Sequence, residues 1–180
     1  MFNINGINSQ WNIYLDNVYE CKNFNRVNDI IGNPSQYLED ILDMEKNLGN
    51  LVGKGPGLTP LGDDFIVGMA AGMESHEVGN GLLANWLSSI HSKTTELSGR
   101  ALFYAAYGWF TEPLIDFAQA IFTTKTKTNP TRLLSIGDTS GTALAYGCLM
   151  GIYAGINFTS QKQHKSQINK KRSLSIKPIT

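Results

Sequence analysis

Two segments of the chain are apolar around nearly the whole circumference of a helix and carry glycines at four-residue intervals. Residues 64–75 include Gly68 and Gly72, and residues 143–158 include Gly147 and Gly151 at the same spacing. A helix that is apolar all round is buried, and glycines four residues apart lie on one side of it, where a second backbone can approach closely. The pattern predicts two central helices with smooth faces in a mainly α domain.

The second segment is too short to cross a membrane. It has about 16 apolar residues, fewer than the roughly 20 that a helix needs to span the hydrocarbon core. The chain of 180 residues suits one domain, and 42% hydrophobic against 17% charged residues provides a sizeable core. We therefore interpret the segment as a buried helix and expect no membrane partner.

Charge and cysteine content restrict the partners and the compartment. Residues 159–180 hold six bases and no acid, which leaves nine bases against 15 acids in the rest of the chain. An acidic body of this kind argues against nucleic-acid binding. Cys21 and Cys148 are too few and too far apart for a disulfide framework, and the first residues lack the pattern of a signal peptide. We expect a cytoplasmic protein.

Start and stop signals divide the chain into three parts. Residues 1–32 are Asn-rich and predict a short arm, either irregular or a single β-strand. Residues 33–158 predict a compact helical domain with Gly-rich loops at helix N-termini, and residues 159–180 a disordered basic tail. Helices are expected at about 34–48, 64–75, 79–91, 95–109, 111–122 and 130–136, and from 141 onward. The aromatic residues expected in the core are Trp86, Phe103, Tyr104, Tyr107 and Trp109.

The stretch LVGKGPGLTPLGDDF, residues 51–65, has the composition of a ligand-binding loop. Glycines adopt positive φ at little cost, so several N–H groups can point into one concavity. The loop also leads into a helix N-terminus, where free N–H groups and the helix dipole favour an anion. It lacks the Gly-Lys-Ser/Thr ending of a Walker loop. The candidate ligand-binding residues are Gly53, Lys54, Gly55, Gly57, Thr59 and Gly62.

Asp63 and Asp64 follow this loop and allow three interpretations. Asp63 can be the N-cap of the next helix, with Asp64 favoured by the dipole. One of the two carboxylates can instead hold Mg²⁺, which would bridge to a phosphate. Alternatively, one of them accepts a hydrogen bond from the ligand or acts as a base. Both are therefore candidate catalytic and metal-binding residues.

Two further hydroxyl-rich helix starts add candidates to the site. Thr94 and Thr95 precede one predicted helix, and Asp138, Thr139 and Ser140 precede the last. Each set is also explained by ordinary capping, and spacing alone does not show that the three helix starts converge. His76 and His91 have no ligand spacing to each other or to cysteine, so we expect no zinc site.

The first loop, GKGPGLTPLGDDFIVGMAAGM, resembles the signature G-x-G-P-G-L-T-P-S-G-D-D-x-L-x-G of the bacterial family DUF2877. LLSIGDTSGTALAYGCLMGI resembles the second block of that family, a turn followed by a Gly-rich helix. Together the likeness covers about residues 49–157. The residues that match are Gly55, Pro56, Gly57, Leu58, Thr59, Pro60, Gly62, Asp63, Asp64, Gly68, Gly137, Ser140 and Gly141. The family includes a subunit associated with oxamate carbamoyltransferase in allantoin breakdown, which works beside a subunit related to acyl-CoA synthetases.

This resemblance implies a subunit that binds a small anion of the phosphate or carbamoyl type and serves carbamoyl transfer with partners. The chain departs from the pattern at Leu61, where Ser is usual, at Asp138, where His is common, and at Thr142-Ala143, which replaces Trp-Asp. The lost imidazole and carboxylate favour the alternative of a non-catalytic assembly or regulatory module, whereas the intact first block favours a retained ligand. A third alternative is a Mg²⁺-dependent hydrolase that uses Asp63, Asp64 and Asp138.

Overall fold

A computed structural model describes residues 10–38, 41–75, 81, 83–122 and 130–175, with side chains as far as Phe158. Within these ranges the chain is helical and has no strand, as predicted. The elements are α1 (Gln10–Tyr19), α2 (Phe24–Ile31), the 3₁₀ turn η1 (Pro34–Tyr37), α3 (Ile41–Gly49), α4 (Leu61–Glu74), α5 (Ala84–Ile90), the 3₁₀ turn η2 (His91–Lys93), α6 (Glu96–Ala106), α7 (Glu112–Phe122), α8 (Thr131–Leu134) and α9 (Ser140–Ser175).

The helix pair α4 and α9 forms the centre of the molecule. A Cβ added at Gly68 or Gly72 would overlap a backbone carbonyl of α9, and one added at Gly147 or Gly151 would overlap a carbonyl of α4. The two glycine-bearing faces therefore lie directly against each other, with backbone touching backbone. This confirms the close approach that the spacing predicts.

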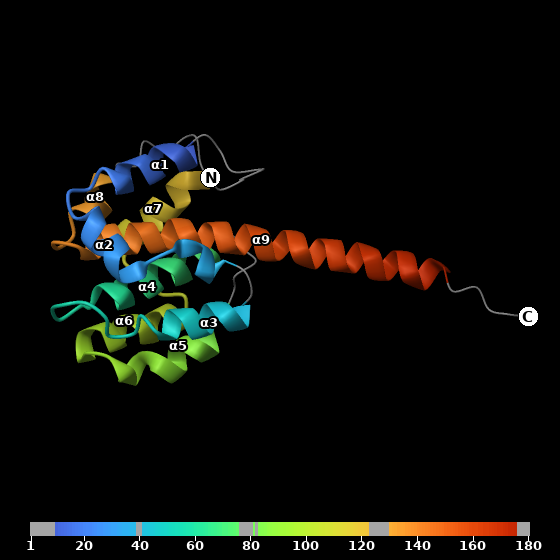
Figure 1. Cartoon of the computed structure of the whole chain (residues 1–180), viewed down its shortest axis with the longest axis horizontal. Helices are drawn as coiled ribbons and strands as arrows, with labels where there is room; N and C mark the ends of the chain where they lie inside the picture. Colours follow the sequence, from blue (N-terminus) through green and yellow to red (C-terminus); the bar gives the residue numbers. More distant parts are fainter. Residues whose placement is uncertain (1–9, 39–40, 76–80, 82, 123–129, 176–180) are drawn as a thin grey trace, which may run out of the picture.

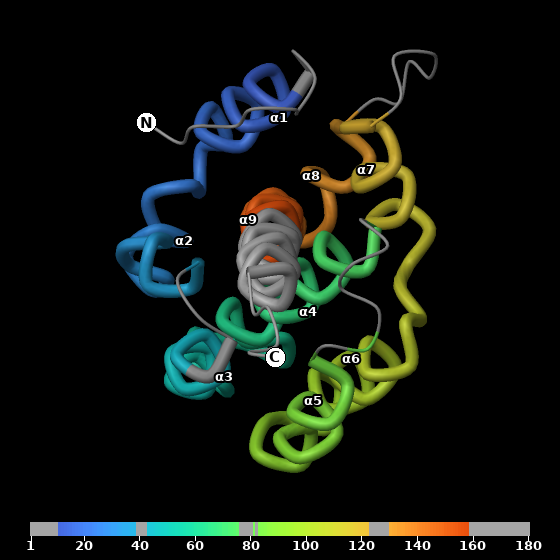
Figure 2. The backbone as a smooth tube through the Cα atoms, turned by 90° about the vertical axis from the view of Figure 1, so that its right-hand side faces the viewer, coloured from blue at the N-terminus to red at the C-terminus, as the bar shows by residue number. Residues whose placement is uncertain are grey.

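The remaining helices surround this pair (Figures 1 and 2). α9 contacts α1, α2, α7 and α8 in addition to α4, while α6 packs on α4 and carries α5 on its other side. Figure 2 looks along α9 and shows it inside this ring, with α5 and α6 at the edge. In the part of the chain that the structure describes, no helix combines the length and the apolar character needed to cross a bilayer.

The prediction of an irregular or β-stranded N-terminal arm is wrong, because residues 10–31 form α1 and α2. The buried side chains of α1 are Trp11, Tyr14 and Val18, which are spaced three and four apart as on one face of a helix. Tertiary burial of this stripe outweighs the weak helix propensity of the Asn and aromatic residues around it. Residues 10–31 of the predicted arm are thus part of the helical domain, and residues 1–9 lie outside the described residues.

Several predicted boundaries shift by a few residues. The helix expected from residue 34 is divided into η1 and α3, although Asn33 caps its start by accepting the N–H of Ser35 at 3.1 Å. α4 begins at Leu61 rather than at residue 64. The backbone of α9 continues to Ser175, and the side chains of the predicted basic tail lie outside the described residues, so its disorder stays a prediction.

Candidate functional site

The segment between α3 and α4 is a tight loop that depends on left-handed glycines. Gly53, Gly55 and Gly57 have φ values of 71°, 113° and 97°, which L side chains rarely adopt. The carbonyl of Lys54 accepts the N–H of Gly62 at 2.8 Å. The loop is therefore folded back against the first turn of α4.

Asp63 is buried in the first turn of α4 and holds this loop in place. Its Oδ1 accepts the N–H of Gly53 at 2.8 Å, and its Oδ2 accepts the hydroxyl of Thr94 at 2.5 Å. The interpretation of Asp63 as the N-cap is wrong: α4 starts at Leu61 with Pro60 in the cap position, since the fixed φ of proline suits a helix start. The carboxylate connects the loop to the start of α6 instead.

The start of α6 makes a second connection to the same loop. Thr95 is the N-cap of α6 and accepts the N–H of Ser98 at 3.2 Å, while its hydroxyl donates to the carbonyl of Leu58 at 2.6 Å. Thr94 therefore bonds to Asp63 in α4 and Thr95 to Leu58 in the loop, and the α6 start is fixed against the α4 start.

The start of α9 completes the cluster. The hydroxyls of Ser140 and Thr59 lie 3.2 Å apart, and Ser140 also hydrogen-bonds Asp64. In Figure 1, the loop before α4 and the turn before α9 lie at the same end of the molecule. The structure thus brings together the three hydroxyl-rich helix starts whose convergence the sequence left open.

Asp138 and Thr139 make different contacts from Ser140. The exposed carboxylate of Asp138 accepts bonds from Arg26 at 2.5 Å and from Asn23 at 2.8 Å. The carbonyl of Thr139 accepts the N–H of Ala143 in the first turn of α9. Asp138 therefore connects the α9 start to α2 and is not placed as a third carboxylate beside Asp63 and Asp64.

Asp64 differs from its neighbour in having an unsatisfied buried oxygen. Its Oδ2 has no hydrogen-bond partner among the described residues. Burial raises the pKa of Asp64 to about 7; the Ser140 hydrogen bond lowers it in part, and the charge of Asp63 raises it further. A carboxyl group with this pKa is substantially protonated near neutral pH, so it can donate a hydrogen bond to an anion instead of repelling it.

The hydrogen bonds within the loop determine which backbone donors remain for a ligand. The N–H groups of Gly53, Lys54 and Gly62 are all engaged by other loop or helix atoms. No hydrogen bond between described residues uses the N–H of Gly55 or of Gly57. The side chain of Lys54 is exposed beside them. The sequence predicted six ligand-binding residues on this loop. The groups that stay available to a ligand are the N–H groups of Gly55 and Gly57, the hydroxyl of Thr59 and the side chain of Lys54.

The three acidic residues near the loop differ in how far their carboxylates are already engaged. Both oxygens of Asp63 accept hydrogen bonds from the protein, and Asp138 is paired with Arg26. Within the described ranges, no group of three or more His, Cys, Asp or Glu side chains is arranged to hold a metal ion. Mg²⁺ is often held by one or two carboxylates together with waters and phosphate oxygens, and among these three residues Asp64 is the one with an unengaged buried oxygen.

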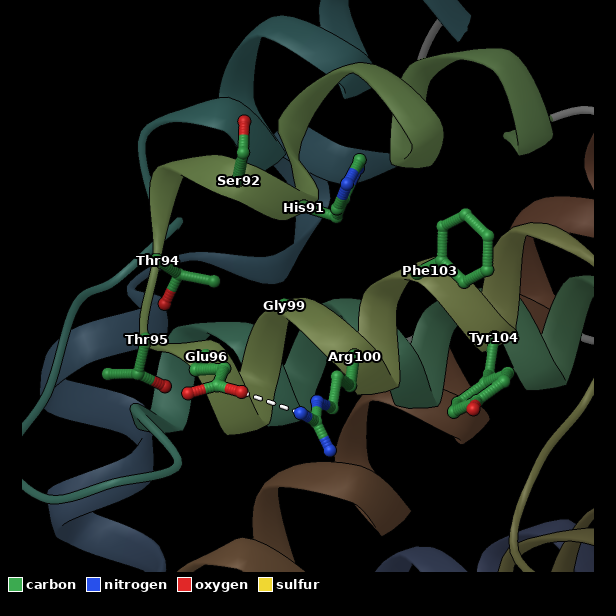
Figure 3. A pocket seen from close by; sticks show the side chains of 9 residues that line it. All are labelled: His91, Ser92, Thr94, Thr95, Glu96, Gly99, Arg100, Phe103 and Tyr104. Atoms are coloured by element: carbon green, nitrogen blue, oxygen red, sulfur yellow. Dashed lines mark hydrogen bonds and ion pairs between the residues drawn. The ribbon is translucent and has the colours of Figure 1, made fainter.

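A hollow of about 490 Å³ lies between η2 and α6, next to this cluster (Figure 3). Phe103 and Tyr104 line this hollow, and Tyr107 and Trp109 follow them in the chain. These four residues are 39–67% exposed, so their predicted place in the core is wrong. Leu102 and Ala105 form the buried face of α6 instead. A helical projection of residues 96–107 separates the two faces and would have shown the aromatic one.

One comparison with known proteins identifies the family. The model of the family described as oxamate carbamoyltransferase subunit AllH matches residues 51–152, which include the loop, α4, α6 and the first part of α9. This agrees with the resemblance implied by the two sequence blocks. No solved structure matches the chain. With more than half of its residues matched, the chain belongs to the oxamate carbamoyltransferase subunit AllH family.

Proposed function

We propose that this chain is the small-anion-binding subunit of a carbamoyltransferase-type complex in nitrogen and purine catabolism, of the kind that degrades allantoin. Membership of the AllH family supports the complex and the pathway. The observation that supports the anion is the unused pair of N–H groups at Gly55 and Gly57 next to the hydroxyls of Thr59 and Ser140. Phosphate and carbamoyl phosphate are the ligands that suit this set of donors.

The charge distribution around the loop suits such a ligand. The N-termini of α4 and α9 meet there, and the helix dipole makes each of them partly positive. The two acids oppose this effect only in part, because the two oxygens of Asp63 are turned to the Gly53 N–H and the Thr94 hydroxyl and Asp64 has its pKa raised to about 7. Lys54 adds a positive charge at the exposed side of the loop.

Asp64 is the residue best suited to proton transfer in this arrangement. A general acid or base works best when its pKa lies near the working pH, and Asp64 meets that condition. Asp63 serves to position the loop, since both of its oxygens are engaged. We expect further catalytic groups to come from partner subunits, among them one related to acyl-CoA synthetases.

A non-catalytic assembly module is the second candidate, and one observation favours it. Gly53, Asp63, Thr94 and Thr95 use their polar groups in bonds between the loop, α4 and the start of α6, so much of the loop can be explained as a packing device. In that case the loop would present a rigid surface to a partner subunit and bind no metabolite.

Ligand-dependent thermal unfolding of the full chain distinguishes the two candidates. A ligand that binds only the native state at about 100 times its dissociation constant adds roughly 2.7 kcal/mol, which raises the unfolding midpoint by about 5 to 10 °C in a chain of this size. The series would compare phosphate, carbamoyl phosphate and oxamate, each with and without Mg²⁺.

Two valine variants make this test specific. Gly57→Val fills open space at the loop and introduces a side chain at φ 97°, whereas Gly108→Val makes the same change at an open position with φ 73° after α6. Anion binding predicts that only Gly57→Val abolishes the ligand-dependent shift. A wild-type chain whose midpoint is unchanged by all three ligands would favour the assembly module.

A further inference from the structure

The hollow beside α6 has a polar end and an aromatic end. Thr95, Glu96 and Arg100 form the polar end, and Phe103 and Tyr104 lie about one turn beyond Arg100 (Figure 3). Residues at positions 96, 100, 103 and 104 share one face because they are three or four apart. With a rise of about 1.5 Å per residue, Arg100 and the two aromatic residues are about 4.5 to 6 Å apart along the helix axis. A ligand that contacts both ends must therefore be longer than a simple anion.

The aromatic end is held in a fixed arrangement. The rings of Phe103 and His91 meet edge to face with centroids 5.5 Å apart, and Tyr104 stacks on Trp109 with centroids 5.8 Å apart and an interplanar angle of 18°. The Nδ1 atom of His91 bonds to the carbonyl of Ser88 at 2.7 Å, so Nδ1 carries the proton and Nε2 of a neutral ring is an acceptor. Such an end suits a flat ring that bears N–H donors.

The polar end offers one cation. Arg100 forms an ion pair with Glu96 at 2.6 Å, and the side chains are 69% and 82% exposed. Exposed i,i+4 pairs of this kind contribute only a few tenths of a kcal/mol, so an incoming phosphate can replace Glu96 as the partner of the guanidinium. Gly99 has no room for a side chain, because a Cβ there would overlap the carbonyl of His91, so η2 packs directly on the backbone of α6 at this point.

We infer that this hollow binds a small molecule in which a planar nitrogen heterocycle is joined to a phosphate, of the nucleoside monophosphate class. The ring packs against Phe103 and Tyr104, whose own rings stand at 70° to each other, and the phosphate pairs with Arg100. The volume of about 490 Å³ lies within the range of pockets that hold such ligands. This site is separate from the proposed anion site at Gly55 and Gly57.

Isothermal titration of the full-length Gly57→Val variant, in which the proposed anion site at the loop is blocked, with AMP, adenosine and inorganic phosphate tests the inference. AMP is expected to bind at least tenfold more tightly than either adenosine or phosphate, because only AMP engages both ends. Arg100→Gln and Phe103→Leu are each expected to weaken AMP binding about tenfold, and Glu96→Gln to strengthen it by removing the competing carboxylate. Circular dichroism would verify that each variant is folded.

Two control variants test whether AMP binds in the hollow beside α6. Arg132→Gln removes an arginine that pairs with Glu112 and Asp116 on a different surface, and Asp64→Asn changes the proposed anion site; both should leave AMP affinity unchanged. The inference is overturned if AMP does not bind, if phosphate alone binds as tightly, or if Arg132→Gln weakens AMP binding as much as Arg100→Gln does. Loss of AMP binding in Asp64→Asn would place the ligand at the loop and also overturn it.

Discussion

The glycines of the α4–α9 pair and those of the loop before α4 perform different tasks. Gly68 and Gly147 have backbone atoms of the facing helix where a Cβ would be, so they are needed for close packing. Gly57 has open space around its Cβ position but a φ of 97°, so it is needed for a backbone conformation. The sequence shows glycine in both regions. The structure shows that glycine is needed in the helix pair because no Cβ fits there, and in the loop because the backbone has a positive φ.

This difference separates the scaffold from the site. A substitution in the helix pair moves two central helices apart and affects the whole fold. A substitution at Gly57 changes only local backbone strain and the surface presented to a ligand. Stability and ligand binding should therefore respond differently to mutation in the two regions, and the following predictions are ordered by the expected size of the effect on stability.

The largest effect is expected for Gly68→Ala. Its Cβ would overlap the carbonyl of Leu144, and because that atom belongs to helix backbone, the helices must separate. We expect a loss of about 3 kcal/mol in the free energy of unfolding, measured by urea denaturation. Gly49→Ala, which meets nothing within 4 Å, is the control and should be neutral; equal losses in both variants would refute the packing explanation.

A smaller loss, about 2 kcal/mol, is expected for Asp63→Asn. The amide cannot accept at both positions, so either the Gly53 N–H or the Thr94 hydroxyl loses its partner in a buried site. Asp116→Asn affects a surface ion pair with Arg132 and should change the free energy of unfolding by less than about 0.5 kcal/mol. If the two variants were equally stable, Asp63 would not clamp the loop.

Asp64→Asn should change the pH dependence of stability. The pKa of this carboxyl is about 7 in the folded chain, against 3.8 for an ordinary aspartate such as that of the unfolded chain, so between these pH values the native state keeps a proton that the unfolded state has lost. Stability due to this group is therefore present at low pH and falls as pH rises toward 7.

Asparagine cannot ionise, so the variant should gain about 2 kcal/mol relative to the wild type between pH 4 and pH 8. Urea denaturation of both proteins across this range measures the difference. A difference that does not change with pH would show that Asp64 titrates normally.

The smallest effect on stability is expected for Gly57→Ala, about 1 kcal/mol, because only the left-handed backbone opposes the new methyl group. Gly55→Ala should cost more, since its Cβ would lie 2.8 Å from the N atom of Leu61. Thermal unfolding of the two variants measures the difference, and a larger loss for Gly57→Ala would contradict the open geometry at that position.

The helical class and the central pair could be predicted because apolar periodicity and four-residue glycine spacing are local signals. The helices α1 and α2 could not, because the burial of Trp11, Tyr14 and Val18 depends on contacts with distant elements. Local propensity is a weak guide where tertiary packing supplies most of the stability of a helix.

For the candidate site, the sequence predicted most of the residues but not their environments. Sequence composition indicated the loop, its two aspartates and the hydroxyls near three helix starts, because Gly, Pro and capping residues have local meanings. The different environments of Asp63 and Asp64 could not be read from adjacent letters, since they depend on Thr94 and Ser140, which lie 31 and 76 residues away in the chain. The aromatic face of α6 was missed because aromatic residues are usually assigned to a core.

Amide chemical shifts of the glycines test the central claim most directly, because glycine resonances fall in a distinct region of a nitrogen–proton correlation spectrum. Carbamoyl phosphate would be titrated into the full chain while the signals of Gly55 and Gly57 are compared with those of Gly68 and Gly147. The account predicts saturable shifts at Gly55 and Gly57 and almost none at the helix-pair glycines. Unchanged signals at Gly55 and Gly57 with saturating ligand, or shifts confined to Gly68 and Gly147, would contradict it.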